Sequence, residues 1–179
     1  MRVRGRLIDN KPQGLCLADG SDLVIHDMRI DLLVDPETFT IVAVENEMMV
    51  RPYSHCEAIL PNYQALVGVS ITRGYTSQIK KLFGGPNGCS HMGALLQAMG
   101  PVAVQATWSL VNLHKSPESR LDNSEDPEEQ ERRLRLNTNS CHVWQEDGEH
   151  IELIKKGEWV LPGWESERLR SLGVEVAEG

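Results

Sequence analysis

Apolar and polar residues alternate at the start of the chain. In "MRVRGRLI", three arginines alternate with Val3, Gly5 and Leu7, which predicts a strand with one face in water. From Val24 to Val44, the runs "VIHDMRIDLLV" and "FTIVAV" flank "DPET", whose Asp-Pro start favours a reverse turn. The second run is rich in Thr, Ile and Val, which fit a pleated surface. These patterns predict an N-terminal strand followed by a hairpin.

The middle of the chain has helical periodicity. "CEAILPNYQALVG" is expected to hold short helical turns, and "TSQIKKLFG" a helix that Thr76 or Ser77 caps. After "GGPNGCSH", four apolar residues recur at helical spacing and predict an amphipathic helix; they are Met92, Leu95, Leu96 and Met99. Gly100-Pro101 interrupts this pattern, and a second or kinked helix is expected to continue to about residue 114.

The last third of the chain is more polar. Residues 115–137 are acidic and are predicted to form a surface excursion with a short helix that begins near Pro127. In "CHVWQEDGEHIEL", Asp147-Gly148 predicts the turn of a second hairpin. The fold class expected is α+β, a small antiparallel sheet packed against helices. We expect one domain over residues 1–179, with its core at about 20–114 and a C-terminal hairpin and tail at 138–179.

Composition narrows the classes of function. The net charge of −8 argues against nucleic acid or an anionic membrane as the main partner, because both attract basic patches. The chain has no apolar run of 18 residues, and its N-terminus lacks the apolar region of a secretory signal. We therefore expect a cytoplasmic protein with reduced thiols, whose partner is another protein or a small molecule.

Cys89 is the first candidate for chemistry. Backbone N–H groups at a helix start lower the pKa of a thiol, and a thiolate is both a nucleophile and a metal ligand. Cys89 also lies three residues before Met92, so it is equally interpretable as part of the apolar helix face. Two residues that lie two apart on a helix point away from each other. Cys89 and His91 can therefore share a ligand only if Cys89 is still in the loop; otherwise His91 caps the helix or faces solvent.

Three further residues are candidates from distant parts of the chain. His26 lies at a strand entry, Cys56 follows the first hairpin, and Cys141 opens the predicted second hairpin. Each also has a structural interpretation, as a hydrogen-bonded turn residue or a core thiol. No CxxC pair is present, so the fold itself would have to assemble any site that the cysteines share, and Cys16, in a predicted loop, is the weakest candidate. Phosphate-loop, nucleophile-elbow and HExxH motifs are also absent.

Three segments together resemble a known family. They are "HDMRIDLLVD", "PYSHCEAILPNYQALVGVSITRGY" and "GGPNGCSHMGALLQ", and they resemble a bacterial family of unknown function with a GC(S/T)H(L/M) signature. The order of hairpin, cysteine, helices and helix-entry cysteine is also similar to that of NifU/IscU-type iron–sulphur scaffolds. That likeness implies ligands near His26 and at Cys56 and Cys89, and the metal-binding hypothesis below adds His91 or Cys141 as the fourth. The first scaffold cysteine has no counterpart here.

These observations support three hypotheses of function. The first is an accessory or scaffold-type protein that binds zinc, iron or an iron–sulphur cluster at a Cys/His site. The second is a small-molecule catabolic enzyme, with Cys89 as nucleophile, His91 as general base or a catalytic metal at the same site. The third is an interaction module that docks through Ser116–Asn137. The sequence leaves open whether the protein is an enzyme.

Overall fold

The computed structural model describes residues 1–11, 16–72, 74–112, 127–158 and 163–176. The chain divides into two compact units, Met1–Asn112 and Leu113–Gly179, and each is described by itself. The expectation of a single domain stays a prediction. The first unit holds the sheet and the helices packed on it, so the α+β fold class is confirmed.

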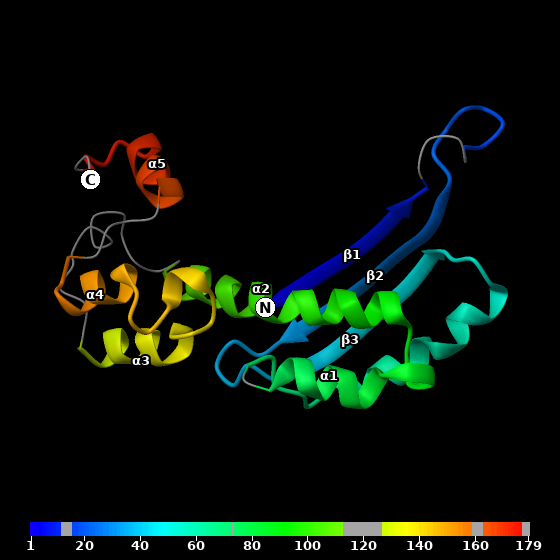
Figure 1. Ribbon diagram of the computed structural model, residues 1–179, viewed down its shortest axis with the longest axis horizontal. Helices are drawn as coiled ribbons and strands as arrows, with labels where there is room; N and C mark the ends of the chain where they lie inside the picture. The colour runs from blue at the N-terminus through cyan, green and yellow to red at the C-terminus, as the bar shows by residue number, and fades with distance from the viewer. Residues whose placement is uncertain (12–15, 73, 113–126, 159–162, 177–179) are drawn as a thin grey trace. The chain divides into compact units, whose positions relative to one another are not determined.

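The sheet of the first unit has three antiparallel strands in the order β1-β2-β3 (Figure 1). The strands are β1 (Arg2–Asn10), β2 (Val24–Val34) and β3 (Ile41–Val50). The predicted N-terminal strand and hairpin are therefore confirmed, although β3 continues beyond the expected end at Val44. It continues because the alternation persists, with Met48 still on the buried face.

Alternation divides the sheet into a buried face and an open face. Val3 and Gly5 of β1 are buried, and so are four apolar residues of β2, namely Met28, Ile30, Leu32 and Val34. The open face carries ion pairs across the strands instead. Arg4 donates two hydrogen bonds of 2.8 Å to the Asp31 carboxylate, and Arg6 binds Asp27 in the same way at 2.9 and 2.7 Å. The open face therefore remains polar, while helices cover the other face.

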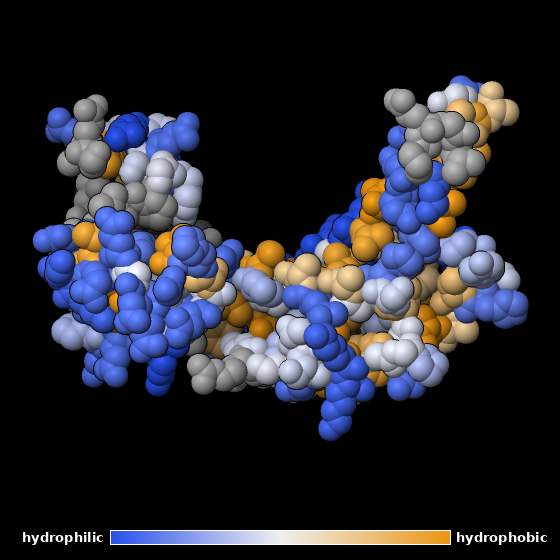
Figure 2. Space-filling model, in the orientation of Figure 1, coloured by the Kyte–Doolittle hydropathy of each residue, from blue (hydrophilic) through white to orange (hydrophobic). Residues whose placement is uncertain are grey.

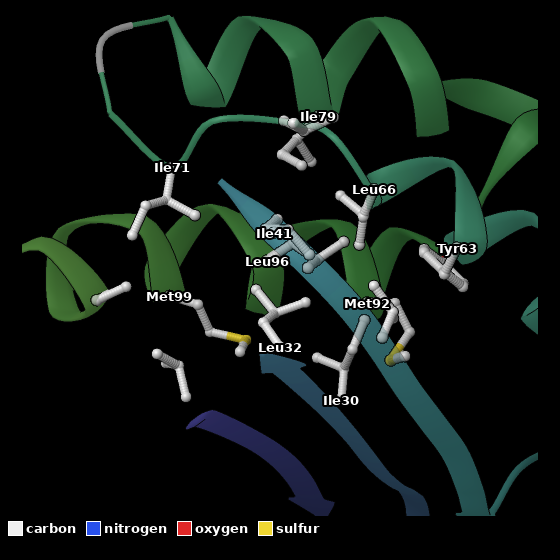
Figure 3. Close-up of a cluster of buried hydrophobic side chains, with 14 of the residues drawn as sticks. Ile30, Leu32, Ile41, Tyr63, Leu66, Ile71, Ile79, Met92, Leu96 and Met99 are labelled. Carbon is white, nitrogen blue, oxygen red and sulfur yellow. The ribbon is translucent and has the colours of Figure 1, made fainter. Parts of the chain in front are cut away.

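Three elements cover the buried face. They are the 3₁₀ segment η1 (Ser54–Leu66), α1 (Tyr75–Phe83) and α2 (Ser90–Asn112), with the short 3₁₀ turn η2 (Gly85–Asn87) between the last two. The core lies between these elements and the sheet (Figure 3). It is built from aliphatic, methionine and aromatic side chains, among them Ile30, Leu32, Ile41, Tyr63, Leu66, Ile79, Met92, Leu96 and Met99.

Two details of the helices differ from the expectation. α1 begins one residue before Thr76, because Gly74 occupies the N-cap position with φ of 86°, and its cap involves no side chain. α2 runs continuously from Ser90 to Asn112 with Pro101 inside it, so the loss of one backbone donor does not end the helix. Of the two expected alternatives, a separate second helix is therefore wrong, because one helix contains both halves of the pattern.

The described part of the second unit is helical. It contains α3 (Pro127–Asn137), the 3₁₀ turn η4 (His142–Trp144), α4 (Glu149–Lys155) and α5 (Gly163–Ser171). α3 confirms the short helix expected at Pro127; the rest of the predicted excursion, residues 115–126, lies outside the described residues. Mostly hydrophilic residues cover α3 and α4 in the view of Figure 2.

The predicted C-terminal hairpin is wrong. Gly148 is the N-cap of α4 rather than a hairpin turn residue, and Glu149 and Glu152 lie in the first helical turn, where acidic side chains are favourable. Ile151 and Ile154, three residues apart, are both buried. That spacing belongs to one face of a helix.

Candidate metal site

Strands β1 and β2 position the first two residues of the site. Asp9 and His26 face each other in the strand register, and they continue the buried face beyond Leu7 and Met28. The Asp9 carboxylate binds His26 twice: Oδ1 accepts from the backbone N–H at 2.6 Å, and Oδ2 lies 2.8 Å from the ring Nδ1. A carboxylate and an imidazole are thus held together at one end of the sheet.

Helix α2 supplies the third residue. A Cβ atom on Gly5 would lie 2.5 Å from Met99 Sδ and 3.1 Å from the Leu95 side chain, so the glycine allows α2 to lie close to β1. Leu95 and His91 lie four and eight residues before Met99, on the same helical stripe. The close contact at Gly5 therefore helps to set the position of His91 along the strand.

Asp9, His26 and His91 form a cluster. One ligand atom from each side chain lies within 4.8 Å of the other two, and this is the sole such group of three or more His, Cys, Asp or Glu side chains in the described ranges. The rings of His26 and His91 have centroids 3.8 Å apart and planes tilted by 32°. The His26 side chain is 12% exposed and that of Asp9 32%, so the cluster is shielded but reachable from solvent.

The charge on Asp9 organises the cluster. The hydrogen bond with His26 lowers the pKa of Asp9 below its usual value, while partial burial opposes that shift. An ionised carboxylate accepts hydrogen bonds only, so Nδ1 of His26 must carry the proton and donate it. In neutral His26 this leaves the Nε2 lone pair free, which is the arrangement in which a carboxylate orients a metal-binding histidine. Asp9 therefore acts in one of two ways: it orients His26 without contacting the ion, or it gives up this hydrogen bond and binds the ion directly.

Cys89 lies immediately beside this cluster. Its carbonyl accepts the N–H of Gly93 at 2.8 Å, which places Cys89 at the N-cap of α2, still outside the first helical turn. The condition for Cys89 and His91 to approach each other is thus met, and Sγ lies 3.8 Å from His91 Nδ1. The thiol also packs partly against the core. Cys89 is therefore both a neighbour of the candidate site and a part of the apolar helix face.

Within the first unit, the other cysteines do not join the cluster. Cys56 lies in η1, partly buried against the core, and it belongs to no group of three candidate ligands among the described residues. Cys16 is exposed in an isolated bridge with Asp22. Cys141 is exposed in the second unit, just before η4. The structure therefore brings together His26 and His91, with Cys89 adjacent to His91.

Asp9 is absent from the candidates predicted from the sequence. A signal for it exists, because Asp9 follows Val3, Gly5 and Leu7 at period two and so places a carboxylate on the buried face of β1. A charged residue that extends a buried stripe needs a partner. The identity of that partner, His26, depends on the pairing of β1 with β2.

The fold and the cluster define a small α+β protein with a candidate metal site at one end of its sheet. A family model described as "Protein of unknown function (DUF2889)" matches residues 1–105, and the chain belongs to this family. Asp9, His26 and His91 all lie within the matched residues. No curated protein and no solved structure matches the chain, so the likeness to NifU/IscU-type scaffolds stays a prediction.

In the part of the chain that the structure describes, every helix is too short or too polar to cross a bilayer.

Proposed function

We propose that this protein binds a single transition-metal ion through Asp9, His26 and His91. One observation carries the proposal: three metal-ligating side chains from β1, β2 and α2 converge to within 4.8 Å. Neighbouring elements position each of them, and in the metal-free protein the Asp9 hydrogen bond holds the His26 ring beside the carboxylate. Ligand side chains that are held in place before the ion binds are typical of metal sites with a defined coordination geometry.

The donor set narrows the choice of ion. Imidazole suits zinc, copper, iron and nickel, whereas calcium and magnesium prefer oxygen ligands. Two histidines with one carboxylate are the ligand set of several catalytic zinc and non-haem iron sites. Iron–sulphur clusters are held mainly by thiolates. The described cluster itself contains no cysteine, and the one thiol reported beside it, that of Cys89, is too few for an iron–sulphur cluster, so we favour a single zinc or ferrous ion.

A second function has its own support, namely catalysis on a small molecule at the same ion. Three protein ligands leave coordination positions open, and open positions distinguish catalytic from closed structural zinc sites. The partial exposure of Asp9 and His26 gives a small molecule access. A bound ion would supply Lewis acidity there, while the two imidazoles and the Asp9 carboxylate would hold it. A binding or delivery role and a catalytic role therefore share the same residues.

Metal analysis of the full-length protein tests the proposal. We expect about one zinc or iron ion per chain after anaerobic purification, or after titration of the metal-free protein. His26→Ala and His91→Ala should abolish this binding. His55→Ala is the matched control, because His55 is exposed in η1 and lies outside the cluster. The proposal would be overturned if the wild-type protein contains no metal as purified and also binds none on titration. Loss of metal binding in His55→Ala, with the fold intact, would overturn it as well.

A further inference from the structure

The backbone of Cys89 is fixed on both sides. Its N–H donates a 2.9 Å hydrogen bond to the hydroxyl of Tyr63, which is fully buried, and its carbonyl accepts the first hydrogen bond of α2. The thiol therefore projects from a defined point at the helix entry, next to His91.

The distance between the thiol and His91 fits a shared ion. Sγ of Cys89 lies 3.8 Å from Nδ1 of His91. In a tetrahedral zinc site, with Zn–S about 2.3 Å and Zn–N about 2.0–2.1 Å, the sulfur and nitrogen ligands lie about 3.6 Å apart. The observed distance between Sγ and Nδ1 is thus close to the distance expected between two ligands of one zinc ion.

We infer that Cys89 is a further ligand of the ion that Asp9, His26 and His91 hold, an inference that rests on the function proposed above. The ligand atoms of Asp9, His26 and His91 lie within 4.8 Å of one another, and Sγ of Cys89 does not belong to this group. Binding of the ion by Cys89 therefore requires rotation of its side chain or of the His91 ring. The thiol releases its proton to solvent as the metal–sulfur bond forms.

A thiolate ligand changes which ions the site selects. Soft sulfur ligands favour zinc and similar ions, whereas manganese and magnesium prefer carboxylates, carbonyls and water. Cys89 would therefore determine metal specificity, adding affinity for Zn²⁺ and Co²⁺ and little for Mn²⁺. With this ligand the protein supplies a Cys-His-His-Asp set, which would fill a tetrahedral site and so favours the binding role over the catalytic one.

Cobalt is the direct probe of the inference. Co²⁺ is added to the metal-free full-length protein, and the sulfur-to-cobalt charge-transfer absorption in the near ultraviolet is recorded. We expect this band in the wild type and in Cys56→Ser, and its loss in Cys89→Ser. Cys56→Ser is the matched control, since Cys56 is another half-buried thiol packed against the core. Zinc affinity of Cys89→Ser should fall at least about tenfold, while Mn²⁺ affinity stays unchanged.

The outcomes separate this inference from the proposed function. If Co²⁺ binds to wild-type protein without a sulfur band, Cys89 is not a ligand and the Asp-His-His site stands. If the band persists in Cys89→Ser, another thiol supplies it and the inference fails. If Co²⁺, Zn²⁺ and Fe²⁺ all fail to bind, the proposed function itself fails. The wild-type spectrum decides the first case even where a variant does not fold.

Discussion

The imidazole rings of His26 and His91 lie with their centroids 3.8 Å apart, although one belongs to β2 and the other to the first turn of α2. This contact joins the sheet to the helix entry at the end of the core. An ion bound there would link the two elements, so metal should stabilise the first unit against unfolding.

Asp9→Asn tests how the carboxylate acts on His26. The amide keeps the size of the side chain but loses the negative charge that either binds the ion or holds the Nδ1 proton of His26. We expect zinc affinity to fall by about 10- to 100-fold, as is typical for partners of metal-bound histidines. Isothermal titration calorimetry measures the change. Asp27→Asn is the control, because Asp27 binds Arg6 on the open face of the sheet. Equal losses in both variants would contradict a specific role for Asp9.

The stability of the metal-free protein should depend on pH through its paired aspartates. Hydrogen bonds from Arg4 lower the pKa of Asp31, and those from Arg6 lower the pKa of Asp27. Each group then ionises more readily in the folded state than in the unfolded state, where its pKa is about 3.9. Below that pH the unfolded chain binds more protons, so the stabilisation is full above about pH 4 and is lost as pH falls through the folded-state pKa.

Urea unfolding at a series of pH values measures this effect. Asp31→Asn should be less stable than the wild type near pH 7, and the difference should shrink as the solution is acidified. A difference that stays constant down to the acid range would show that the Asp31 charge is not responsible.

The sheet could be predicted from the sequence because one face of each strand is buried. Apolar residues on that face, such as Val3 in β1, Ile30 in β2 and Val44 in β3, therefore alternate with residues of the open face. The C-terminal hairpin could not, because Asp147-Gly148 is compatible with both a hairpin turn and a helix start. The burial of Ile151 and Ile154 on one helical face, and the hydrogen bond from the Glu152 N–H to the Gly148 carbonyl, distinguish them.

The site was only partly accessible from the sequence, for a related reason. His26, Cys89 and His91 stand out by residue type, but their proximity depends on how α2 crosses β1 over Gly5. Cys56 is a thiol like Cys89 and follows the hairpin in the sequence, yet it packs on the core outside the cluster. Residue type suggests ligands, whereas tertiary packing decides which of them meet.

Two glycines of α2 should respond oppositely to alanine. A Cβ on Gly100 would lie 2.6 Å from Cδ1 of Tyr75, whereas a Cβ on Gly93 meets nothing within 4 Å. Alanine gains about 1 kcal/mol over glycine inside a helix, but overpacking against the buried Tyr75 ring costs about 1–3 kcal/mol. We therefore expect Gly93→Ala to raise the free energy of unfolding and Gly100→Ala to lower it. Thermal denaturation of both variants checks this, and a stabilised Gly100→Ala would show that the ring moves freely.

The two buried tyrosines should differ when each loses its hydroxyl. Burial raises the pKa of both, but they differ in partners: Tyr63 Oη accepts the N–H of Cys89 at 2.9 Å, whereas Tyr75 Oη is buried with no hydrogen-bond partner among the described residues. Tyr63→Phe should cost about 1–3 kcal/mol, because it leaves a backbone donor without its acceptor. Tyr75→Phe removes an unsatisfied group and should be neutral or stabilising.

Denaturant unfolding of the two variants gives the comparison directly. Zinc titration of Tyr63→Phe adds a second readout, since release of the Cys89 backbone should also weaken metal binding at the neighbouring site. In Tyr75→Phe, zinc affinity should be unchanged, because Tyr75 contacts α2 near Gly100, more than two helical turns from His91. A large destabilisation of Tyr75→Phe would mean that its hydroxyl binds a buried water molecule, which would itself account for a polar group at that position.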